Sequence, residues 1–276
     1  CMNEPATVAR IAELVRRASP STIVILGGAG AAIHEEMRRS ADLTVLGPGE
    51  LTLEALLLTL RTGKDLFQCR GIAVTRDSSG NAVTVSRELD PALISAPAWD
   101  VFPTLRSGCF SAEVSKGCAY KCLFCSYPDR GRQRYRPVEN VIAEIARDAD
   151  RFGARYIRFV DPNFTSRPDY VTRFCAALKA AGLSIPWSCF ARIDELARAP
   201  ELCAAMADAG CFWIYSGIES GEKSILREMD KRFQPDSIGR GIRNAKAAGI
   251  LLHGNFVTGF PGETAETLKR TLELIK

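Results

Sequence analysis

Apolar positions near the start of the chain alternate between helical and extended spacing. In residues 5–18 they recur every three or four positions, which predicts a helix that ends before Pro20. The recurring positions are Val8, Ile11, Ala12 and Val15. Two more helices are expected, one running to about residue 39 and one over residues 50–62 with Gly63 as its C-cap.

Short apolar runs between these helices predict strands. Residues 22–26 and 43–46 are each followed by glycines, and residues 71–75 and 82–86 flank a polar turn and predict a hairpin. Together these elements predict a partial open α/β layer. Such a layer usually starts with a strand, so we expect the chain to be truncated on its N-terminal side.

Residues 88–107 show no periodicity, which predicts a linker. Its prolines are Pro91, Pro97 and Pro103. We therefore expect a first α/β domain over residues 1–87 and a second domain over residues 108–276.

The second domain repeats a strand–helix unit about five times. The expected strands are residues 111–115, 155–160, 185–190, 211–217 and 250–257. Pro137 and Pro168 suit first helical positions, residues 138–152 carry an amphipathic stripe, and a glycine closes each helix. These glycines are Gly153, Gly182, Gly210 and Gly249. The repeat predicts a parallel sheet with helices outside it, a partial barrel whose chemistry lies at the C-terminal ends of the strands.

Composition narrows the chemistry. The chain has 276 residues and a net charge of +4, and its apolar runs are too short to cross a bilayer. Two histidines do not favour mechanisms that need several imidazoles. Ten cysteines without a secretory signal predict a cytoplasmic protein with free thiols or metal ligands rather than disulfides.

Three of these cysteines lie close together after the first strand of the second domain. Cys118, Cys122 and Cys125 have the spacing Cys-x3-Cys-x2-Cys. Three thiolates in one loop can bind three irons of a [4Fe–4S] cluster and leave the fourth iron open. Structural zinc is an alternative, although it usually takes four ligands in two pairs. Three unconnected core thiols are another.

This loop resembles the signature of the radical S-adenosylmethionine (SAM) superfamily, and the resemblance extends over about residues 108–276. It implies that Cys118, Cys122 and Cys125 bind the cluster and that SAM chelates the open iron. It also implies that Phe124, just before the last cysteine, lies near the adenine of SAM.

Polar residues after the second and third strands resemble further family positions. Asp161 and Asn163 stand where relatives place polar groups toward the methionine end of SAM. Arg192 is expected to bind the SAM carboxylate, because its planar fork bonds two oxygens at once. A surface arginine on the next helix is the alternative.

The ends of the fourth and fifth strands continue the resemblance. Glu219 and Ser220 resemble a ribose-contacting stretch, and a glycine-rich turn with a capping serine is the alternative. Gly259 is expected to allow close approach of the backbone to the adenine.

The first domain resembles the second half of a cobalamin-binding domain. Gly27 and Gly28, after the first strand, would let the backbone approach the nucleotide tail of cobalamin. The Asp-x-His-x-x-Gly motif of cobalamin proteins is absent and would lie upstream, so cobalamin binding is a hypothesis. A dinucleotide site is not favoured, because Ile33 stands where that pattern needs its third glycine.

A basic run precedes the helix predicted over residues 138–152. Its arginines are Arg130, Arg132, Arg134 and Arg136. We expect a solvated loop there, with a role in anionic substrate binding left open, rather than a nucleic-acid site.

The sequence therefore predicts an α/β protein, a partial Rossmann-like cobalamin-type domain followed by a partial (β/α) radical SAM barrel. The expected activity is reductive cleavage of SAM by a [4Fe–4S] cluster, followed by hydrogen abstraction for cobalamin-dependent C-methylation or cyclisation. A cobalamin-free, methylthiotransferase-like enzyme and a non-catalytic zinc-stabilised binding module are the alternatives. Expected partners are a small-molecule or peptide substrate and a reductant such as flavodoxin or ferredoxin.

The residues do not identify the substrate. A full barrel of this family has six strands and the sequence stops after the fifth, so we expect truncation at both ends.

Overall fold

The computed structural model describes residues 4–28, 30–31, 34–66, 69, 71–74, 82–83, 90–101, 108–127 and 129–276. The chain forms two compact units. The N-terminal unit comprises Cys1–Ser95 with Ser126–Asp129, and the C-terminal unit comprises Ala96–Cys125 with Arg130–Lys276.

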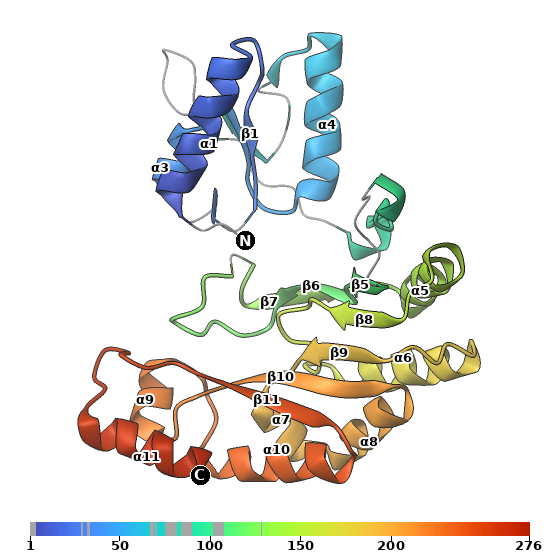
Figure 1. The fold of residues 1–276 in the computed structure, drawn as a ribbon, viewed down its shortest axis with the longest axis vertical. Coiled ribbons are helices and arrows are strands. Elements are labelled where there is room, and N and C mark those ends of the chain that lie inside the picture. Colours follow the sequence, from blue (N-terminus) through green and yellow to red (C-terminus); the bar gives the residue numbers. More distant parts are fainter. Residues whose placement is uncertain are drawn as a thin grey trace. The chain divides into compact units, whose positions relative to one another are not determined.

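The N-terminal unit is a four-stranded sheet with helices (Figure 1), as the hydrophobic pattern predicts. Its strands, in sheet order, are β1 Ile25–Leu26, β2 Leu43–Val45, β3 Ile72–Val74 and β4 Ala82–Val83. Strands β1 and β2 are parallel, whereas β3 is antiparallel to both β2 and β4. The helices are α1 Pro5–Ala18, α3 Glu35–Arg39 and α4 Gly49–Thr62.

These elements confirm the predicted helices and hairpin, although the turn at residues 77–81 lies outside the described residues. Strand β1 is shorter than predicted, because the N–H of Val24 bonds to the Asp42 carboxylate (2.8 Å). Gly63 caps α4 in the left-handed conformation, with φ 65°. The core of this unit consists of Leu43, Val45, Leu56, Cys69 and Ile72.

The predicted linker contains two short 3-10 helices, Pro91–Leu93 and Trp99–Val101. Trp99 donates from Nε1 to Asp148 Oδ2 (3.0 Å) and meets the ring of Phe110 edge-on. The second of these helices thus packs on the C-terminal unit. Pro103 lies outside the described residues.

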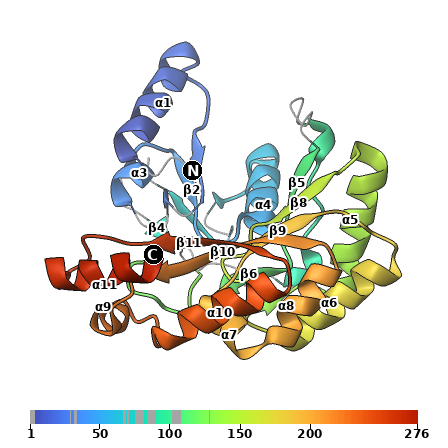
Figure 2. The same cartoon turned by 60° about the horizontal axis from the view of Figure 1, so that its bottom comes forward.

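The C-terminal unit is built on a five-stranded parallel sheet with the order β11-β10-β9-β8-β5. Its strands are β5 Cys109–Ala112, β8 Tyr156–Phe159, β9 Trp187–Phe190, β10 Cys211–Glu219 and β11 Leu251–Phe256. Its helices lie on one side of this sheet (Figures 1 and 2). They are α5 Val138–Phe152, α6 Pro168–Ala180, α7 Ile193–Arg198, α8 Pro200–Asp208, α9 Lys223–Glu228, α10 Asp236–Ala247 and α11 Ala265–Ile275. This arrangement confirms the partial barrel.

Aromatic residues fill the space between this sheet and its helices. Phe159 and Trp187 on the strands meet Phe164 and Phe174 at ring-centroid distances of 5.0–6.3 Å. All four side chains are at most 1% exposed. Aromatic packing of this kind stabilises a core beyond the area that it buries.

Three predictions in this unit are wrong. The first strand is β5, Cys109–Ala112, rather than residues 111–115, and the chain then forms a separate strand, β6 Ser115–Cys118. The basic run is not a solvated loop, because residues Arg132–Tyr135 form β7, which pairs antiparallel with β6. Pro137 is the N-cap of α5 rather than its first residue. Strand β7 has no apolar alternation, and its pairing with β6 is a tertiary contact that the local pattern does not report.

Among the described residues, no helix combines the length and the apolar composition needed to cross a membrane.

Candidate functional site

The three cysteines lie at and after the end of β6, where β7 supports their loop. Cys118 is the last residue of β6 and pairs with Arg132 of β7. The carbonyl of Cys118 accepts the N–H of Gly131 (2.7 Å), and that of Cys122 accepts Nη1 of Arg130 (2.8 Å). Residues 130–132, at and just before the start of β7, therefore hold the backbone of the cysteine loop in place.

The thiols of this loop are within electrostatic reach of one another. Burial raises the pKa of the Cys118 thiol, and its electrostatic interactions with the neighbouring Cys122 and Cys125 thiols raise it further. In the described part of the chain, no three His, Cys, Asp or Glu side chains lie close enough together to bind one metal ion. A [4Fe–4S] cluster does not need such convergence, because each thiolate binds a different iron.

Arg192 is buried beside this loop, between β9 and α7. Its side chain is 7% exposed, so it is not a surface arginine. Nη1 lies 3.9 Å from the sulfur of Cys122, and the guanidinium carbon lies 3.8 Å from the ring centroid of Tyr120. Nε donates to Asp194 Oδ1 (2.9 Å), and Nη2 donates to the carbonyl of Lys231. A fixed positive charge therefore faces the cysteine loop.

Glu195 joins the second and third strand ends to the cysteine loop. Its carboxylate accepts the hydroxyl of Tyr120 (2.7 Å), the amide of Asn163 (3.0 and 3.1 Å) and the hydroxyl of Thr165 (2.6 Å). Asn163 Oδ1 in turn accepts the N–H of Arg192 (3.2 Å). Burial and the Glu195 charge raise the pKa of Tyr120, so its hydroxyl stays protonated and donates.

A short segment after α9 also braces the cysteine loop. The carbonyl of Met229 accepts the N–H of Leu123 (3.0 Å), and buried Lys231 donates to Glu219 Oε1 (3.1 Å). Asp230 and Arg232 are left-handed at φ 53° and 58°, a costly backbone conformation that is concentrated at functional sites. Lys231 Nζ also lies 5.7 Å from the ring centroid of Phe124.

The predicted residues therefore divide by location. The loop and the strand ends bring together Phe124, Asn163, Arg192 and Glu219 with the three cysteines. Ser220 instead bonds to Thr271 of α11 (3.1 Å), and the N–H of Gly259 bonds to Glu263 Oε2 (2.5 Å). Sequence reasoning missed Tyr120, Asp194, Glu195 and Lys231. Tyr120, Asp194 and Glu195 lie within or beside the stretches that it named, whereas Lys231 carries no local signal.

Asp161 holds the chain that leads into β6. Its carboxylate accepts the N–H groups of Val114 (3.1 and 3.2 Å) and Ser115 (2.6 Å) and the Ser115 hydroxyl (2.5 Å). Burial raises the pKa of Asp161 from 3.8 to about 7, against these donors, which lower it. Asp161 thus positions the strand that carries Cys118.

We expect this carboxyl to make stability pH-dependent. A pKa that is higher in the folded than in the unfolded chain adds stability that is complete below the unfolded pKa and is lost as pH rises through the folded pKa. The free energy of unfolding should therefore fall between about pH 4 and about pH 7 relative to Asp161→Asn, measured by urea denaturation. A free energy of unfolding that rises with pH in the unmodified chain, relative to Asp161→Asn, would contradict this expectation.

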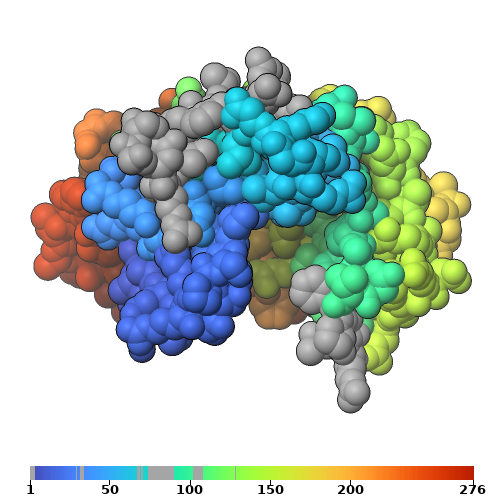
Figure 3. All heavy atoms as spheres, turned by 90° about the horizontal axis from the view of Figure 1, so that it is seen from above, coloured from blue at the N-terminus to red at the C-terminus, as the bar shows by residue number. Residues whose placement is uncertain are grey.

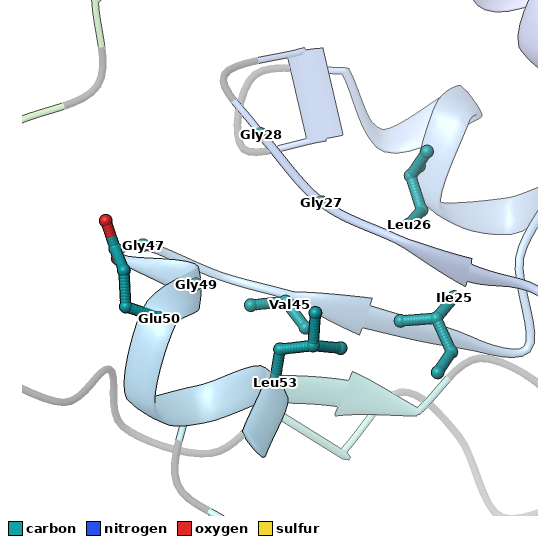
Figure 4. Close-up of a pocket in the computed structure, with 9 residues that line it drawn as sticks. All are labelled: Ile25, Leu26, Gly27, Gly28, Val45, Gly47, Gly49, Glu50 and Leu53. Carbon is teal, nitrogen blue, oxygen red and sulfur yellow. The ribbon is translucent and has the colours of Figure 1, made fainter. Parts of the chain in front are cut away.

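The N-terminal unit has a cavity at the C-terminal ends of β1 and β2 (Figure 4). Its volume is about 540 Å³. Ile25, Val45 and Leu53 form an apolar floor, and Gly27 and Gly28 lie along one rim. Gly28 has φ 90°, and a Cβ there would meet no atom within 4 Å, so glycine is needed for the backbone and not for packing. The cavity therefore offers an apolar surface bordered by exposed backbone.

Comparison with known proteins identifies the family. Residues 112–275, more than half of the chain, match the model of the radical SAM superfamily. The chain belongs to the radical SAM superfamily. Members use a [4Fe–4S] cluster and SAM, and the loop that holds the three cysteines falls within the matched residues.

Curated relatives cover the whole chain. "Uncharacterized methyltransferase PH0819" of Pyrococcus horikoshii is 28% identical over 100% of this chain and 61% of its own length. Cytidylyl-2-hydroxyethylphosphonate methyltransferase of Streptomyces wedmorensis is 25% identical over 98% of this chain and 59% of its own length. The chain thus spans about 60% of the length of these two relatives.

Solved structures share the fold of both units. The cobalamin-dependent radical SAM enzyme OxsB superposes with a TM-score of 0.83 at 21% identity, covering 96% of this chain and 40% of that one. The radical SAM methyltransferase TsrM from Kitasatospora setae gives 0.81 at 18% identity, covering 98% and 56%. The fold class predicted from the sequence is therefore confirmed.

Proposed function

We propose that this chain forms the cofactor-binding part of a cobalamin-dependent radical SAM methyltransferase. The observation that carries the proposal is the loop of Cys118, Cys122 and Cys125, held by β7 and faced by the buried Arg192 guanidinium. The donor set suits a [4Fe–4S] cluster, because it offers three thiols from one loop and no fourth residue of the chain is needed. The methyltransferase relatives support the reaction class.

The chemistry comes from the bound cofactors. One electron from the cluster would break the C5′–S bond of SAM, releasing methionine and a 5′-deoxyadenosyl radical that takes hydrogen from an unreactive carbon, with cobalamin supplying the methyl group.

The residues of the chain bind and orient. Cys118, Cys122 and Cys125 would be the cluster ligands, and Arg192 places positive charge beside them. Phe124, at the edge of the loop and 36% exposed, offers a ring for the adenine. Asn163 and Glu219 fix the positions of Arg192 and Lys231 through the bonds described above. Ser220 and Gly259 remain predicted SAM contacts from the fourth and fifth strand ends.

The proposal is tested by reconstituting the chain with iron and sulfide under anaerobic conditions and adding SAM and dithionite. We expect visible charge-transfer absorbance and formation of 5′-deoxyadenosine. One bound zinc, no visible absorbance and no SAM cleavage would instead support a structural zinc module. In the cell, flavodoxin or ferredoxin is the proposed reductant in place of dithionite.

The cavity of the N-terminal unit is the proposed site for the nucleotide tail of cobalamin. Its apolar floor suits a planar base, and its glycine rim admits a sugar-phosphate backbone. Cobalamin binding also separates this proposal from a cobalamin-free, methylthiotransferase-like enzyme.

Filling this cavity is expected to weaken cobalamin binding. A Cβ at Gly27 would lie 3.7 Å from Val45, an ordinary contact, so Gly27→Leu should fold with its side chain in the cavity. Overpacking costs about 1–3 kcal/mol, so we expect affinity to fall roughly tenfold or more, measured by titrating the chain with cobalamin.

The matched control is Leu58→Phe on α4, a helix at the surface of the N-terminal unit (Figure 3, cyan). Leu58 is 51% exposed and lies outside the cavity lining. Affinity should stay unchanged in this variant. Equal affinity in Gly27→Leu and Leu58→Phe would count against the cavity as the site.

A further inference from the structure

The sheet of the C-terminal unit has a second face that carries its own chemistry. On β8, Ile157 and Phe159 point into the helix-covered core, so Tyr156 and Arg158 alternate onto the other face. On β10 and β11 the same alternation places Trp213, Tyr215 and His253 on this face. We name this set, together with Phe190 of β9 and Ser111 of β5, the open sheet face.

Arg158 stands in the middle of the open sheet face. Its guanidinium carbon lies 5.6 Å from the ring centroid of Phe190 and 5.4 Å from that of Tyr215. Two rings thus hold the guanidinium, which is planar and can stack on aromatic faces. The side chain is exposed on this face.

Within the part of the chain that the structure describes, the guanidinium of Arg158 makes no hydrogen bond and no ion pair, so no acidic group among those residues neutralises its charge. By contrast, the guanidinium of Arg192 is bonded to Asp194 and the one of Arg136 to Glu144. The guanidinium of Arg158 therefore presents its N–H donors in a fixed orientation, and such a fork matches a carboxylate or a phosphate.

The neighbours of Arg158 complete a site for a small molecule. Ser111 lies directly across from Arg158 on β5 and offers an exposed hydroxyl. On the other side, the rings of Tyr215 and Trp213 stack with centroids 5.7 Å apart, and His253 lies 5.4 Å from Tyr215. The open sheet face thus combines one cation, one hydroxyl and an aromatic surface.

We propose that the open sheet face binds the substrate, and that this substrate is a small oxyanion, a carboxylate or phosphate, attached to a planar apolar body. Arg158 and Ser111 would bind the anionic group, and the Tyr215 and Trp213 rings would cover the apolar body. This inference rests on the proposed function, because it names the class of molecule that would donate the hydrogen.

The test measures binding of three probes to the chain without cluster, SAM or cobalamin. The probes are phenylacetate, phenyl phosphate and the neutral phenylacetamide, followed by quenching of tryptophan fluorescence and by calorimetry. We expect at least one anion to bind at least about tenfold more tightly than the amide, since charge-assisted bonds are worth about 1.5–3 kcal/mol. Tighter binding of phenyl phosphate would identify a phosphate, and tighter binding of phenylacetate a carboxylate.

Two variants localise the binding. Arg158→Gln should weaken the preferred anion at least about tenfold, and Ser111→Asp should do the same by pairing with Arg158 while leaving it in place. The matched control is Arg173→Gln on α6, an exposed arginine that also lies over a ring, that of Tyr170, at 5.9 Å. The Arg173→Gln variant should bind the preferred anion with the same affinity as the unmodified chain.

Equal affinity in Arg158→Gln and the unmodified chain, equal binding of the amide, or no binding of either anion would each overturn the inference. These outcomes are independent of the radical chemistry, because the probes bind without cofactors. If SAM cleavage fails while the anion still binds through Arg158, the proposed function falls and the anion site remains.

Discussion

Replacing Cys122 with alanine is expected to abolish both the cluster and the formation of 5′-deoxyadenosine. Cys122 is 9% exposed and its sulfur faces Arg192, so no other described thiol of the loop can take its place without moving the backbone. Two remaining thiolates would leave two irons of the cubane without protein ligands. Iron and sulfide content, visible absorbance and product are measured after anaerobic reconstitution, and all should match a blank without protein.

The control is Cys203→Ala. Cys203 is a fully buried thiol in α8, and burial raises its pKa to about 11, so it stays protonated and is a poor metal ligand. This variant should keep the cluster and the product. Unchanged product in Cys122→Ala would refute the assignment of the cysteine loop.

Replacing Arg136 with methionine is expected to lower the free energy of unfolding strongly. Nη2 of Arg136 donates to Glu144 Oε2 (2.7 Å), and each side chain is 3% exposed. Burial raises the pKa of Glu144 even with this partner present. Removing one member of a buried pair leaves an uncompensated charge and costs about 3–5 kcal/mol. The free energy of unfolding, measured in urea, should fall by that amount.

The double variant Arg136→Met/Glu144→Leu separates the pair from its surroundings. Replacing both members of a buried ion pair by apolar residues is often neutral, so most of the lost stability should return. Part of the loss should persist, because Arg136 Nη1 also donates to the carbonyl of Glu113 (2.9 Å). If the single variant were as stable as the double one, the loss could not be assigned to an unpaired Glu144.

Local sequence signals predicted the helices most accurately. Residues 138–152 form α5 with the expected bounds. The amphipathic stripe and the C-cap glycine Gly153 are signals carried by residues that are close together in the sequence. The same holds for α1, Pro5–Ala18. The cysteine spacing is a local signal as well, and it sufficed to indicate the family that the comparisons identify.

Strands were predicted less well, because a strand is completed by a partner that can lie far along the chain. The basic run carried no strand pattern, yet it pairs with β6 and supports the cysteine loop. The first barrel strand ends at Ala112, earlier than the pattern indicated, and Val114 and Ser115 beyond it bond to Asp161, more than 40 residues further on.

The sequence by itself determined most of the helices, the five strands of the parallel sheet, the two α/β layers and the three thiols of one loop, since these depend on neighbours within a few residues. Only the tertiary structure decided which polar groups meet at the strand ends. Glu195, Lys231 and Arg158 owe their environments to side chains between about 10 and 80 residues away, or to an adjacent strand. Charge and hydrogen bonding act through space, so no periodicity along the chain could have reported these contacts.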